Sequence, residues 1–472
     1  MVPCSGSQSP ASVGNASRIS PGGSSADGIP PPDVAQLTAF VSIVPLLECD
    51  EANPAMTATK PRTLPVLPAA PAPRPSEEAE VCALVAPVPL DEDVRIDLGE
   101  ALERAQLPPG RGRLAVVAMS GGVDSGVTAL LMKEAGYRTI GINMRLFTPE
   151  EGHSQCCSID DMEDARAVCQ RLGVPFYPLN MEREFVGAVI EPFVDAYLAG
   201  RTPNPCLECN RKPKFNFLLG RAKALGAVAL ATGHYARTER GADGRYRLRR
   251  SYDERKDQSY VLYTLTQEQL GRVLFPVGAL SKPEVRALAR QYELPVARKA
   301  ESQDICFVPT GDYAAFVLSR RPGAAKAGPI VDPAGRVLGE HRGLIHYTVG
   351  QRRGLGLTTQ EPMFVMELDT AANRLVVGTA GQLGFVSLRA SAVNYVGGGV
   401  PSGPQPIIAV LRYRGQEHPA TLIPTGSDTA RIDFAEPPRS VAPGQAVVFY
   451  DAHDRTVVLG GGTVEGTERG AL

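Results

Sequence analysis

The residues best suited to chemistry form a short polar loop, 120–125 (Ser-Gly-Gly-Val-Asp-Ser), directly after the apolar run 114–119. That run predicts a buried strand, and the residues after the loop predict a helix. Two glycines let backbone N–H groups converge on an anion, and a helix N-terminus favours negative charge. Ser120 and Ser125 add hydroxyl donors, and Asp124 can hold a magnesium ion against phosphates. The spacing is not that of a Walker loop, so we expect a phosphate-binding loop of another kind.

Three cysteines in two further motifs could carry sulfur chemistry. Cys206 and Cys209 form a Cys-x-x-Cys pair after a proline-rich loop, and Cys306 stands alone much further along the chain. A thiol near a helix N-terminus and beside Arg211 or Lys212 would be a good nucleophile. Structural zinc would need four ligands, and these motifs supply three thiols with no histidine beside them. A thioredoxin-like dithiol would account for the pair but not for Cys306 or the phosphate loop.

Residues 111–310 predict the scaffold that brings these motifs together. Strands and helices alternate there, and this alternation predicts an α/β fold with a doubly wound parallel sheet. Ligands of such sheets bind at the carboxyl ends of the strands. A capping box from Ser281 to Glu284 opens a helix that runs to Tyr292. The other expected elements are strands at 139–144, 174–179 and 227–232 and helices at 161–172, 182–198 and 213–225.

The remaining regions differ from this pattern. Residues 1–110 hold 18 of the 41 prolines and carry a net charge of −8, which predicts a disordered extension. After about residue 310 the helical period fades, and we expect a central β domain at 311–385 and a C-terminal β-barrel at 386–472. The β segments that support this division are 364–368, 374–377, 407–413, 420–423, 430–434, 446–450 and 456–459.

Composition bounds the class of protein. The chain has 472 residues, of which 43% are hydrophobic and 21% charged, and no apolar stretch is long enough to cross a membrane. Nine cysteines in a chain of this length are not a disulfide framework, and their odd number fits a reducing compartment. We therefore expect a cytoplasmic protein, not bound to a membrane and monomeric. Cys156, Cys157 and Cys169 lie in or beside a helix and are expected to be packing thiols.

Six motifs in a fixed order resemble those of the bacterial tRNA-specific 2-thiouridylases, and the phosphate loop resembles that of the ATP pyrophosphatases (PP-loop enzymes). The resemblance covers residues 113 to about 465. It implies an adenine-nucleotide α-hydrolase-like fold in the first of the folded regions. The motifs are 120–125, 200–205, 231–235, 256–260, 305–307 and 350–356.

The resemblance implies ATP-dependent thiolation of the wobble uridine in tRNAs for Lys, Glu and Gln. The C2 oxygen is first adenylylated, which releases pyrophosphate and makes AMP a leaving group. A persulfide on Cys306 then supplies sulfur, and Cys209 frees or resolves it, leaving a Cys209–Cys306 disulfide. The implied cofactors are ATP and Mg²⁺, and the partners are tRNA and a persulfide carrier or cysteine desulfurase.

Site residues follow from the resemblance, position by position. Residues implied to hold ATP are Ala118, Met119, Ser120, Gly121, Gly122, Val123, Asp124, Ser125, Met144 and Gly233. Residues implied to line the target base are Asn204, Pro205 and Cys206, and further tRNA contacts are His234, Lys256, Asp257, Gln258, Arg412, Tyr413 and Gln445.

One position departs from the common pattern of the family. Many members have Asp where this chain has Cys206, and a thiol does not replace a carboxylate at neutral pH. The Cys-x-x-Cys form raises a second mechanism, in which Cys206, Cys209 and Cys306 ligate a [4Fe–4S] cluster that carries the sulfide. The sequence does not decide between persulfide and cluster, and no metal ligand is assigned.

Two other functions stay open at the level of sequence. One is another pyrophosphatase-superfamily enzyme, such as an argininosuccinate synthase or a GMP synthetase, which would need no paired thiols. The other is a non-enzymatic ATP-binding module with a redox-switched disulfide. Release of pyrophosphate that depends on added tRNA would distinguish both from a thiouridylase.

Overall fold

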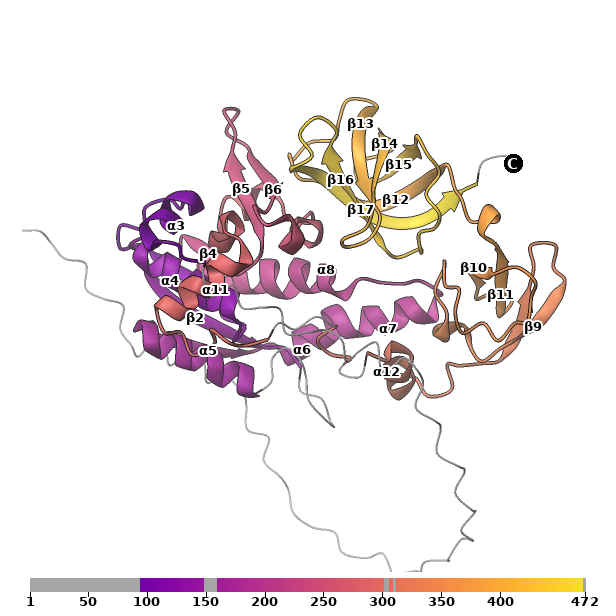
Figure 1. Cartoon of the computed structure of the whole chain (residues 1–472), viewed down its shortest axis with the longest axis horizontal. Helices are drawn as coiled ribbons and strands as arrows, with labels where there is room; N and C mark the ends of the chain where they lie inside the picture. The colour runs from indigo at the N-terminus through magenta and orange to yellow at the C-terminus, as the bar shows by residue number, and fades with distance from the viewer. Residues whose placement is uncertain (1–93, 148–158, 301–304, 309–310, 470–472) are drawn as a thin grey trace, which may run out of the picture. The chain divides into compact units, whose positions relative to one another are not determined.

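The computed structural model describes residues 94–147, 159–300, 305–308 and 311–469 (Figure 1). All of them belong to one compact unit of the chain, Val85–Leu472. Cys156 and Cys157, expected to be packing thiols, lie outside the described residues. None of the described helices is both long enough and apolar enough to cross a membrane.

A five-stranded parallel sheet forms the first region, as the alternation of strands and helices predicts. Its spatial order is β3-β2-β1-β4-β7. Val116 of the central strand packs into one apolar core, and its neighbours Ala115 and Val117 pack into another on the opposite face. Both faces are therefore covered, which explains why this strand is apolar throughout. The strands are β1 (Leu114–Ala118), β2 (Arg138–Arg145), β3 (Phe176–Asn180), β4 (Ala229–Ala231) and β7 (Val273–Leu274).

Helices cover the two faces of this sheet, and two of them contain π-helical turns. The predicted helix 182–198 is continuous but has such a turn in its middle, η1 (Val186–Ile190). The helix predicted at 213–225 begins eight residues earlier, at Pro205, because Pro213 lies inside the π-helical turn η2 (Asn210–Leu218) and does not start the helix. The α-helical parts are α4 (Val123–Glu134), α5 (Ile159–Leu172), α6 (Glu182–Phe185), α7 (Glu191–Leu198), α8 (Pro205–Cys209), α9 (Leu219–Ala224), α10 (Gln267–Leu270), α11 (Lys282–Gln291) and α12 (Tyr313–Arg320).

One helix lies inside the range expected to be a disordered extension. Helix α3 (Leu98–Ala105) begins at Asp97, whose side chain accepts hydrogen bonds from the backbone of Gly99 and Glu100. Ile96 and Ala101 are buried in the same core as α4 and α11. The boundary at 110 is therefore too late, because residues 94–110 belong to the folded domain. One short helix among prolines is too brief for its period to stand out in the sequence.

Two β regions follow, and the second is a closed barrel of six strands. The first sheet has the order β10-β11-β8-β9 and includes one parallel pair, β8 with β11. In the barrel, β12 pairs with both β15 and β17, which closes the sheet around its own core. The strands are β8 (Gly328–Val331), β9 (Val337–His341), β10 (Met363–Asp369), β11 (Arg374–Thr379), β12 (Ser387–Tyr395), β13 (Gln405–Val410), β14 (Glu417–Pro424), β15 (Ala430–Phe434), β16 (Ala446–Asp451) and β17 (Val457–Glu468).

A hairpin that the sequence reading did not predict links the first region to the barrel. Strands β5 (Ala236–Arg240) and β6 (Tyr246–Arg250) follow the parallel strand β4 and form a hairpin (Figure 1). Strand β6 also pairs with β17. The barrel sheet therefore continues into a segment that comes some 200 residues earlier in the chain. This pairing fixes the barrel beside the carboxyl end of β4.

Candidate active site

The phosphate loop connects β1 to α4, and a close backbone contact requires glycine at position 121. Gly121 has φ +77°, and a Cβ atom there would lie 2.1 Å from the backbone oxygen of Asp161. The hydroxyl of Ser125 donates to the backbone oxygen of Gly122 over 3.0 Å and accepts from the backbone N–H of Ser120 over 3.2 Å. The loop thus folds tightly over the N-terminus of α4, where backbone N–H groups favour an anion.

Gly233 meets this loop, and Met144 lies at the end of the neighbouring strand. Gly233 follows β4, and a Cβ atom there would come within 2.8 Å of the backbone of Asp124 and Ser125. Met144 is buried at the end of β2, the neighbour of β1 in the sheet. The residues implied to hold ATP are therefore brought together at the carboxyl ends of β1, β2 and β4, as a doubly wound sheet predicts.

Asp124 is held by two side chains that the sequence reading missed. Its Oδ1 atom accepts from the ammonium of Lys282 over 2.6 Å and from the hydroxyl of Tyr235 over 2.8 Å. Lys282 is only 7% exposed, and a buried ammonium is stable only beside a carboxylate. The capping box predicts that a helix starts at Lys282, but nothing in the sequence indicates that the lysine ammonium points at the phosphate loop.

The donor set at the loop fits magnesium bound to phosphates. Mg²⁺ usually takes one or two carboxylates and completes its shell with water and substrate phosphates, and Asp124 supplies one carboxylate beside the backbone donors. Among the residues that the structure describes, no three His, Cys, Asp or Glu side chains gather as a metal site without substrate.

The Cys-x-x-Cys pair lies on the short helix α8. The side chain of Asn204 accepts from the backbone N–H of Cys206 over 3.1 Å, which fixes the start of that helix. Cys206 is exposed and Cys209 is buried. The cations expected beside these thiols form ion pairs with a carboxylate: Arg211 and Lys212 lie 2.7 and 3.4 Å from Glu208.

Cys306 lies against the same apolar cluster that contains Cys209. Its neighbour Phe307 anchors it there, packing edge-on against Phe185 at 5.8 Å and Phe193 at 5.1 Å between ring centroids. One core thus holds both of the thiols that the resemblance implies to be catalytic. Cys169 is fully buried elsewhere, where desolvation raises the pKa of its thiol to about 12, as expected of a packing thiol.

The arrangement of the three thiols does not fit an iron–sulfur cluster. Cys206, Cys209 and Cys306 are all among the described residues, and they do not come together as a three-thiolate ligand set. The first thiol is exposed to solvent while the second is buried in the core. We therefore derive no step through a cluster.

The loop 200–205 before α8 is clamped by the barrel. The side chain of Gln445 donates to the backbone oxygen of Thr202 over 2.7 Å, and the Thr202 N–H donates to the oxygen of Pro443 over 2.8 Å. Arg201 pairs with Glu465 at 3.1 Å. Gln445, implied to contact tRNA, therefore shapes the loop that carries Asn204 and Pro205.

A cleft of about 470 Å³ opens between the segment after β6 and the barrel segment after β13. Tyr413 is 37% exposed in its wall, and Arg412 beside it is exposed. Burial raises the pKa of the Tyr413 hydroxyl. The lining of the cleft includes Arg250, Arg255, Tyr260, Tyr413, Arg414 and Tyr450. Aromatic faces and guanidinium groups of this kind suit unpaired nucleotides.

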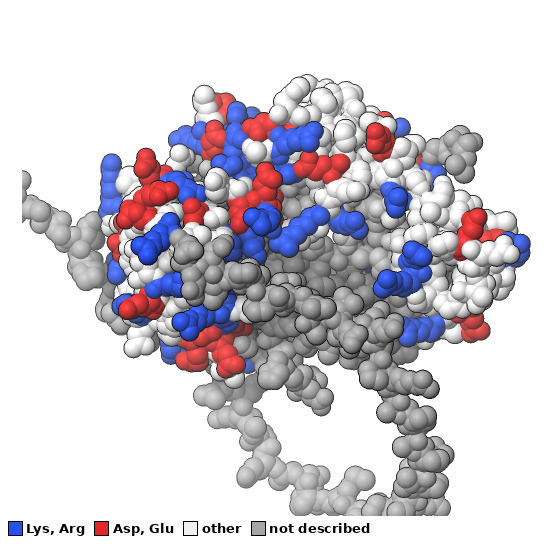
Figure 2. Space-filling view, in the orientation of Figure 1, with Lys and Arg blue, Asp and Glu red and all other residues white. Residues whose placement is uncertain are grey.

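Three residues implied to contact tRNA turn their side chains inward. His234 is buried against Phe215 and Phe275, and burial, with Lys214 nearby, holds its pKa well below 6.5. The carboxylate of Asp257 accepts from the backbone of Ser251 and from Ser259. Gln258 accepts from the backbone N–H of Tyr235, and Lys256 is half-buried. On the face drawn in Figure 2, Lys and Arg side chains lie interspersed with Asp and Glu.

Comparison with known proteins adds the family. Three family models match, described as tRNA methyl transferase HUP domain (113–310), tRNA methyl transferase PRC-barrel domain (316–379) and Aminomethyltransferase beta-barrel domain (386–464). A solved 4-thiouridine synthetase–RNA complex with bound ATP aligns with a TM-score of 0.29 at 17% identity, covering 46% of this chain and 53% of that one. That score is too low to support an argument.

Curated relatives are far more similar. The tRNA-specific 2-thiouridylase MnmA of Geotalea uraniireducens is 50% identical over 362 residues, which are 74% of this chain and 94% of that protein. The protein of the same name from Moorella thermoacetica is 49% identical over 355 residues, 74% of this chain and 99% of that protein. The chain therefore belongs to the MnmA family of tRNA-specific 2-thiouridylases, which are sulfurtransferase enzymes.

Proposed function

We propose that this enzyme catalyses the ATP-dependent 2-thiolation of the wobble uridine in tRNAs for Lys, Glu and Gln. The proposal rests on one observation: the same domain contains the phosphate loop at Asp124 and two thiols that contact one apolar core. These thiols are Cys209 and Cys306. The family adds tRNA as the substrate. We expect the enzyme to act in the cytoplasm as a monomer.

The first step is adenylylation. The loop binds the phosphates of ATP, and Asp124 would hold Mg²⁺, which would neutralise phosphate charge. The C2 oxygen of uridine attacks the α-phosphorus, and the bond to the β-phosphate breaks with release of pyrophosphate. The uridine then carries AMP as a leaving group. Lys282 and Tyr235 keep the carboxylate of Asp124 oriented toward the loop.

The second step is sulfur transfer. The terminal sulfur of a persulfide on Cys306 attacks C2, and the C–O bond to AMP breaks. The Cys209 thiolate then attacks the Cys306 sulfur, which breaks the S–S bond, releases 2-thiouridine and leaves a Cys209–Cys306 disulfide. Two thiols are oxidised as the sulfane sulfur is reduced, so a dithiol reductant must restore them. A persulfide carrier or cysteine desulfurase then reloads Cys306.

Cys206 is assigned to the base pocket in this scheme. It lies at the exposed start of α8, directly after the clamped loop. These features support a role in lining the site of the extruded uridine together with Asn204 and Pro205. Arg412, Tyr413 and Lys256 are proposed to contact the flanking nucleotides. His234, Asp257, Gln258 and Gln445 are proposed to support that contact by holding the surrounding loops.

The proposal is tested by mass analysis of tRNA nucleosides. A strain that lacks this gene should lose 2-thiouridine at the wobble position, and complementation should restore it. In vitro, the purified enzyme should release pyrophosphate from ATP only when unmodified tRNA is added. Pyrophosphate release without tRNA, or wild-type levels of 2-thiouridine in the deletion strain, would contradict the proposal.

A further inference from the structure

Two hydrogen-bonded connections run from the turn 253–258 to a single oxygen atom of the phosphate loop, Oδ1 of Asp124. We propose that Asp253, through Lys282, and Gln258, through Tyr235, couple RNA binding at this turn to the binding of ATP. This inference rests on the proposed function, because it takes tRNA and ATP as the two ligands. Asp253 is thereby assigned as a positioning residue, a role that no resemblance implied.

The first connection passes through the start of helix α11. Oδ2 of Asp253 accepts from the backbone N–H of Lys282 over 3.0 Å. The ammonium of the same lysine donates to Oδ1 of Asp124 over 2.6 Å. A shift of the turn that carries Asp253 would therefore move the backbone from which the lysine reaches the loop.

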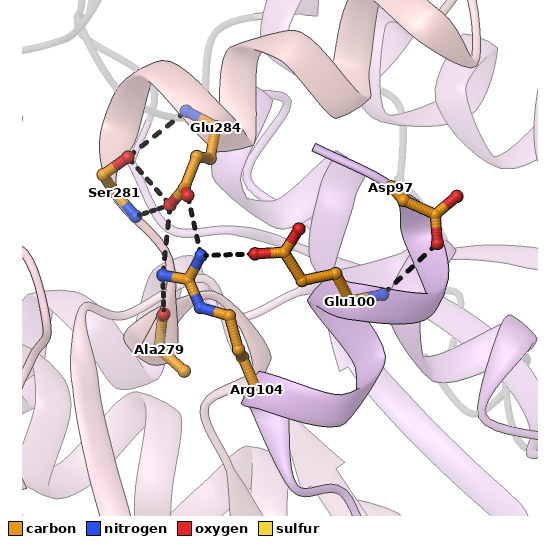
Figure 3. Close-up of polar contacts among 6 residues, drawn as sticks. All are labelled: Asp97, Glu100, Arg104, Ala279, Ser281 and Glu284. Atoms are coloured by element: carbon orange, nitrogen blue, oxygen red, sulfur yellow. Dashed lines mark hydrogen bonds and ion pairs between the residues drawn. The ribbon is translucent and has the colours of Figure 1, made fainter. Parts of the chain in front are cut away.

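Hydrogen bonds tie the start of α11 into one rigid unit, so a shift at the backbone of Lys282 would be passed on to its side chain. The carboxylate of Glu284 accepts from the backbone N–H and the hydroxyl of Ser281, at 2.7 and 2.8 Å. Arg104 of α3 adds an ion pair to Glu284 at 2.7 Å and a hydrogen bond to the backbone oxygen of Ala279 (Figure 3). Lys282 therefore belongs to a rigid helix start that is hydrogen-bonded to Asp253.

The second connection passes through Tyr235. Gln258 and Tyr235 exchange two hydrogen bonds: the backbone N–H of Gln258 donates to the oxygen of Tyr235 over 2.8 Å, and its side-chain oxygen accepts from the Tyr235 N–H over 2.9 Å. The buried Tyr235 hydroxyl then donates to Oδ1 of Asp124 over 2.8 Å. Both connections thus end on one oxygen, and the ring of Tyr235 also faces the Lys282 ammonium at 5.8 Å.

The turn is built as one piece with an exposed cation at its centre. Asp253 accepts from the backbone of Arg255 over 3.1 Å, and the Asp257 carboxylate joins the backbone of Ser251 to that of Ser259. Arg255 is exposed and lines the cleft described above. A tRNA phosphate that binds Arg255 would therefore fix the whole turn, including both ends that lead to Asp124.

Coupling between two ligands is reciprocal, which gives a sharp test. Affinity for a non-hydrolysable ATP analogue is measured by calorimetry with and without saturating unmodified tRNA, and tRNA affinity with and without the analogue. In the wild type each ligand should strengthen the other by the same factor, between about fivefold and a hundredfold. In Asp253→Ala the tRNA-free affinity for the analogue should stay within about twofold, while the coupling factor falls toward one.

Two further variants complete the experiment. Tyr235→Phe removes only the hydroxyl on Asp124 and should also reduce the coupling factor, which keeps the test valid if Asp253→Ala folds poorly. Asp243→Ala is the matched control, because Asp243 accepts from the backbone of Arg245 in a similar turn at the tip of the β5–β6 hairpin. It should keep the wild-type coupling factor. A role in folding alone would lower both affinities without changing that factor.

The outcomes separate this inference from the proposed function. Wild-type coupling that persists in both Asp253→Ala and Tyr235→Phe, or a wild type that binds the two ligands independently, would overturn the inference. Either result would leave thiolation by the wild type intact. Failure of the wild type to thiolate tRNA would instead contradict the proposed function.

Discussion

The side-chain amide of Gln445 donates a hydrogen bond of 2.7 Å to the backbone oxygen of Thr202, 243 residues earlier in the chain. The barrel therefore shapes the loop from which the Cys-x-x-Cys helix starts. We predict that Gln445→Ala lowers tRNA thiolation about fivefold, which corresponds to the loss of one hydrogen bond of about 1 kcal/mol, and leaves ATP affinity unchanged. Thiolation rates at varied tRNA concentration check this. Gln382→Ala, which removes a similar bond to the backbone of Thr379 in the central sheet, should have no effect.

Asp124 is expected to be required for the first chemical step. Asp124→Asn keeps the shape of the side chain and removes the charge that would hold Mg²⁺. The activation free energy should therefore rise by several kcal/mol, and the rate of pyrophosphate release should fall about 100-fold or more. The unmatched, buried Lys282 should also lower the melting temperature. Asp160→Asn, on the exposed start of α5, is the control. Normal pyrophosphate release by folded Asp124→Asn would contradict the assignment of the loop.

The thiols separate the two mechanisms of sulfur transfer. Under persulfide transfer, Cys306→Ser and Cys209→Ser should abolish 2-thiouridine formation, while Cys206→Ser should keep substantial activity. Cys169→Ser, at a buried packing thiol, should lower stability but not activity per folded molecule. Nucleoside mass analysis after a fixed reaction time measures all four variants.

Iron content provides the complementary measurement. Because the three thiols do not form a three-thiolate ligand set among the described residues, we predict that protein purified without oxygen holds no stoichiometric iron. About four irons per chain, together with complete loss of activity in Cys206→Ser, would contradict persulfide transfer and favour a [4Fe–4S] centre.

The buried His234 should make stability depend on pH. Its folded pKa lies well below 6.5, so below pH 6.5 the unfolded chain takes up a proton that the folded chain does not. Stability should therefore fall as pH drops from 6.5 toward the folded pKa, by up to about 1.4 kcal/mol per pH unit from this group. Urea unfolding from pH 7 to pH 5 should show a shallower loss in His234→Gln. His453→Gln, at an exposed barrel turn, should keep the wild-type slope.

The position of helix α3 sets how far the N-terminal segment can be removed without loss of stability. Removing residues 1–93 should leave a soluble, active enzyme, because their composition predicts no packed core. Removing residues 1–110 would also delete the buried Ile96 and the Arg104–Glu284 ion pair, at a cost of at least about 2 kcal/mol. Thermal unfolding and thiolation of the two truncated proteins check this. Equal melting temperatures would show that α3 adds no stability.

The local signals of the fold could be read from the sequence. Val116 and its neighbours are apolar on both sides of the strand, which is typical of a parallel strand covered by helices, and the capping box at Ser281 starts α11 as predicted. The β5–β6 hairpin could not be predicted in the same way, because β6 is stabilised by β17, far along the chain. Pairing between distant segments leaves no local period.

In the candidate site, too, local motifs could be predicted from the sequence and contacts between distant segments could not. The type and spacing of the glycines predict the phosphate loop from the sequence, and the structure shows the contact with Asp161 that requires Gly121. Lys282 and Tyr235 carried no such signal, because the direction of a long side chain depends on the tertiary fold. His234 was expected to face the substrate, and it is buried because Phe215 and Phe275 enclose its ring.

The last strand has a consequence for how the protein is made. β17 pairs with β12 and β16 to close the barrel, and with β6 beside the active site. During synthesis the catalytic segments leave the ribosome long before residues 457–468 exist. The loop at Thr202 and the edge of β6 therefore lack their final partners until the barrel residues up to 468 have been made. A ribosome that stops early releases a chain with the catalytic cysteines in place and no closed barrel to position them.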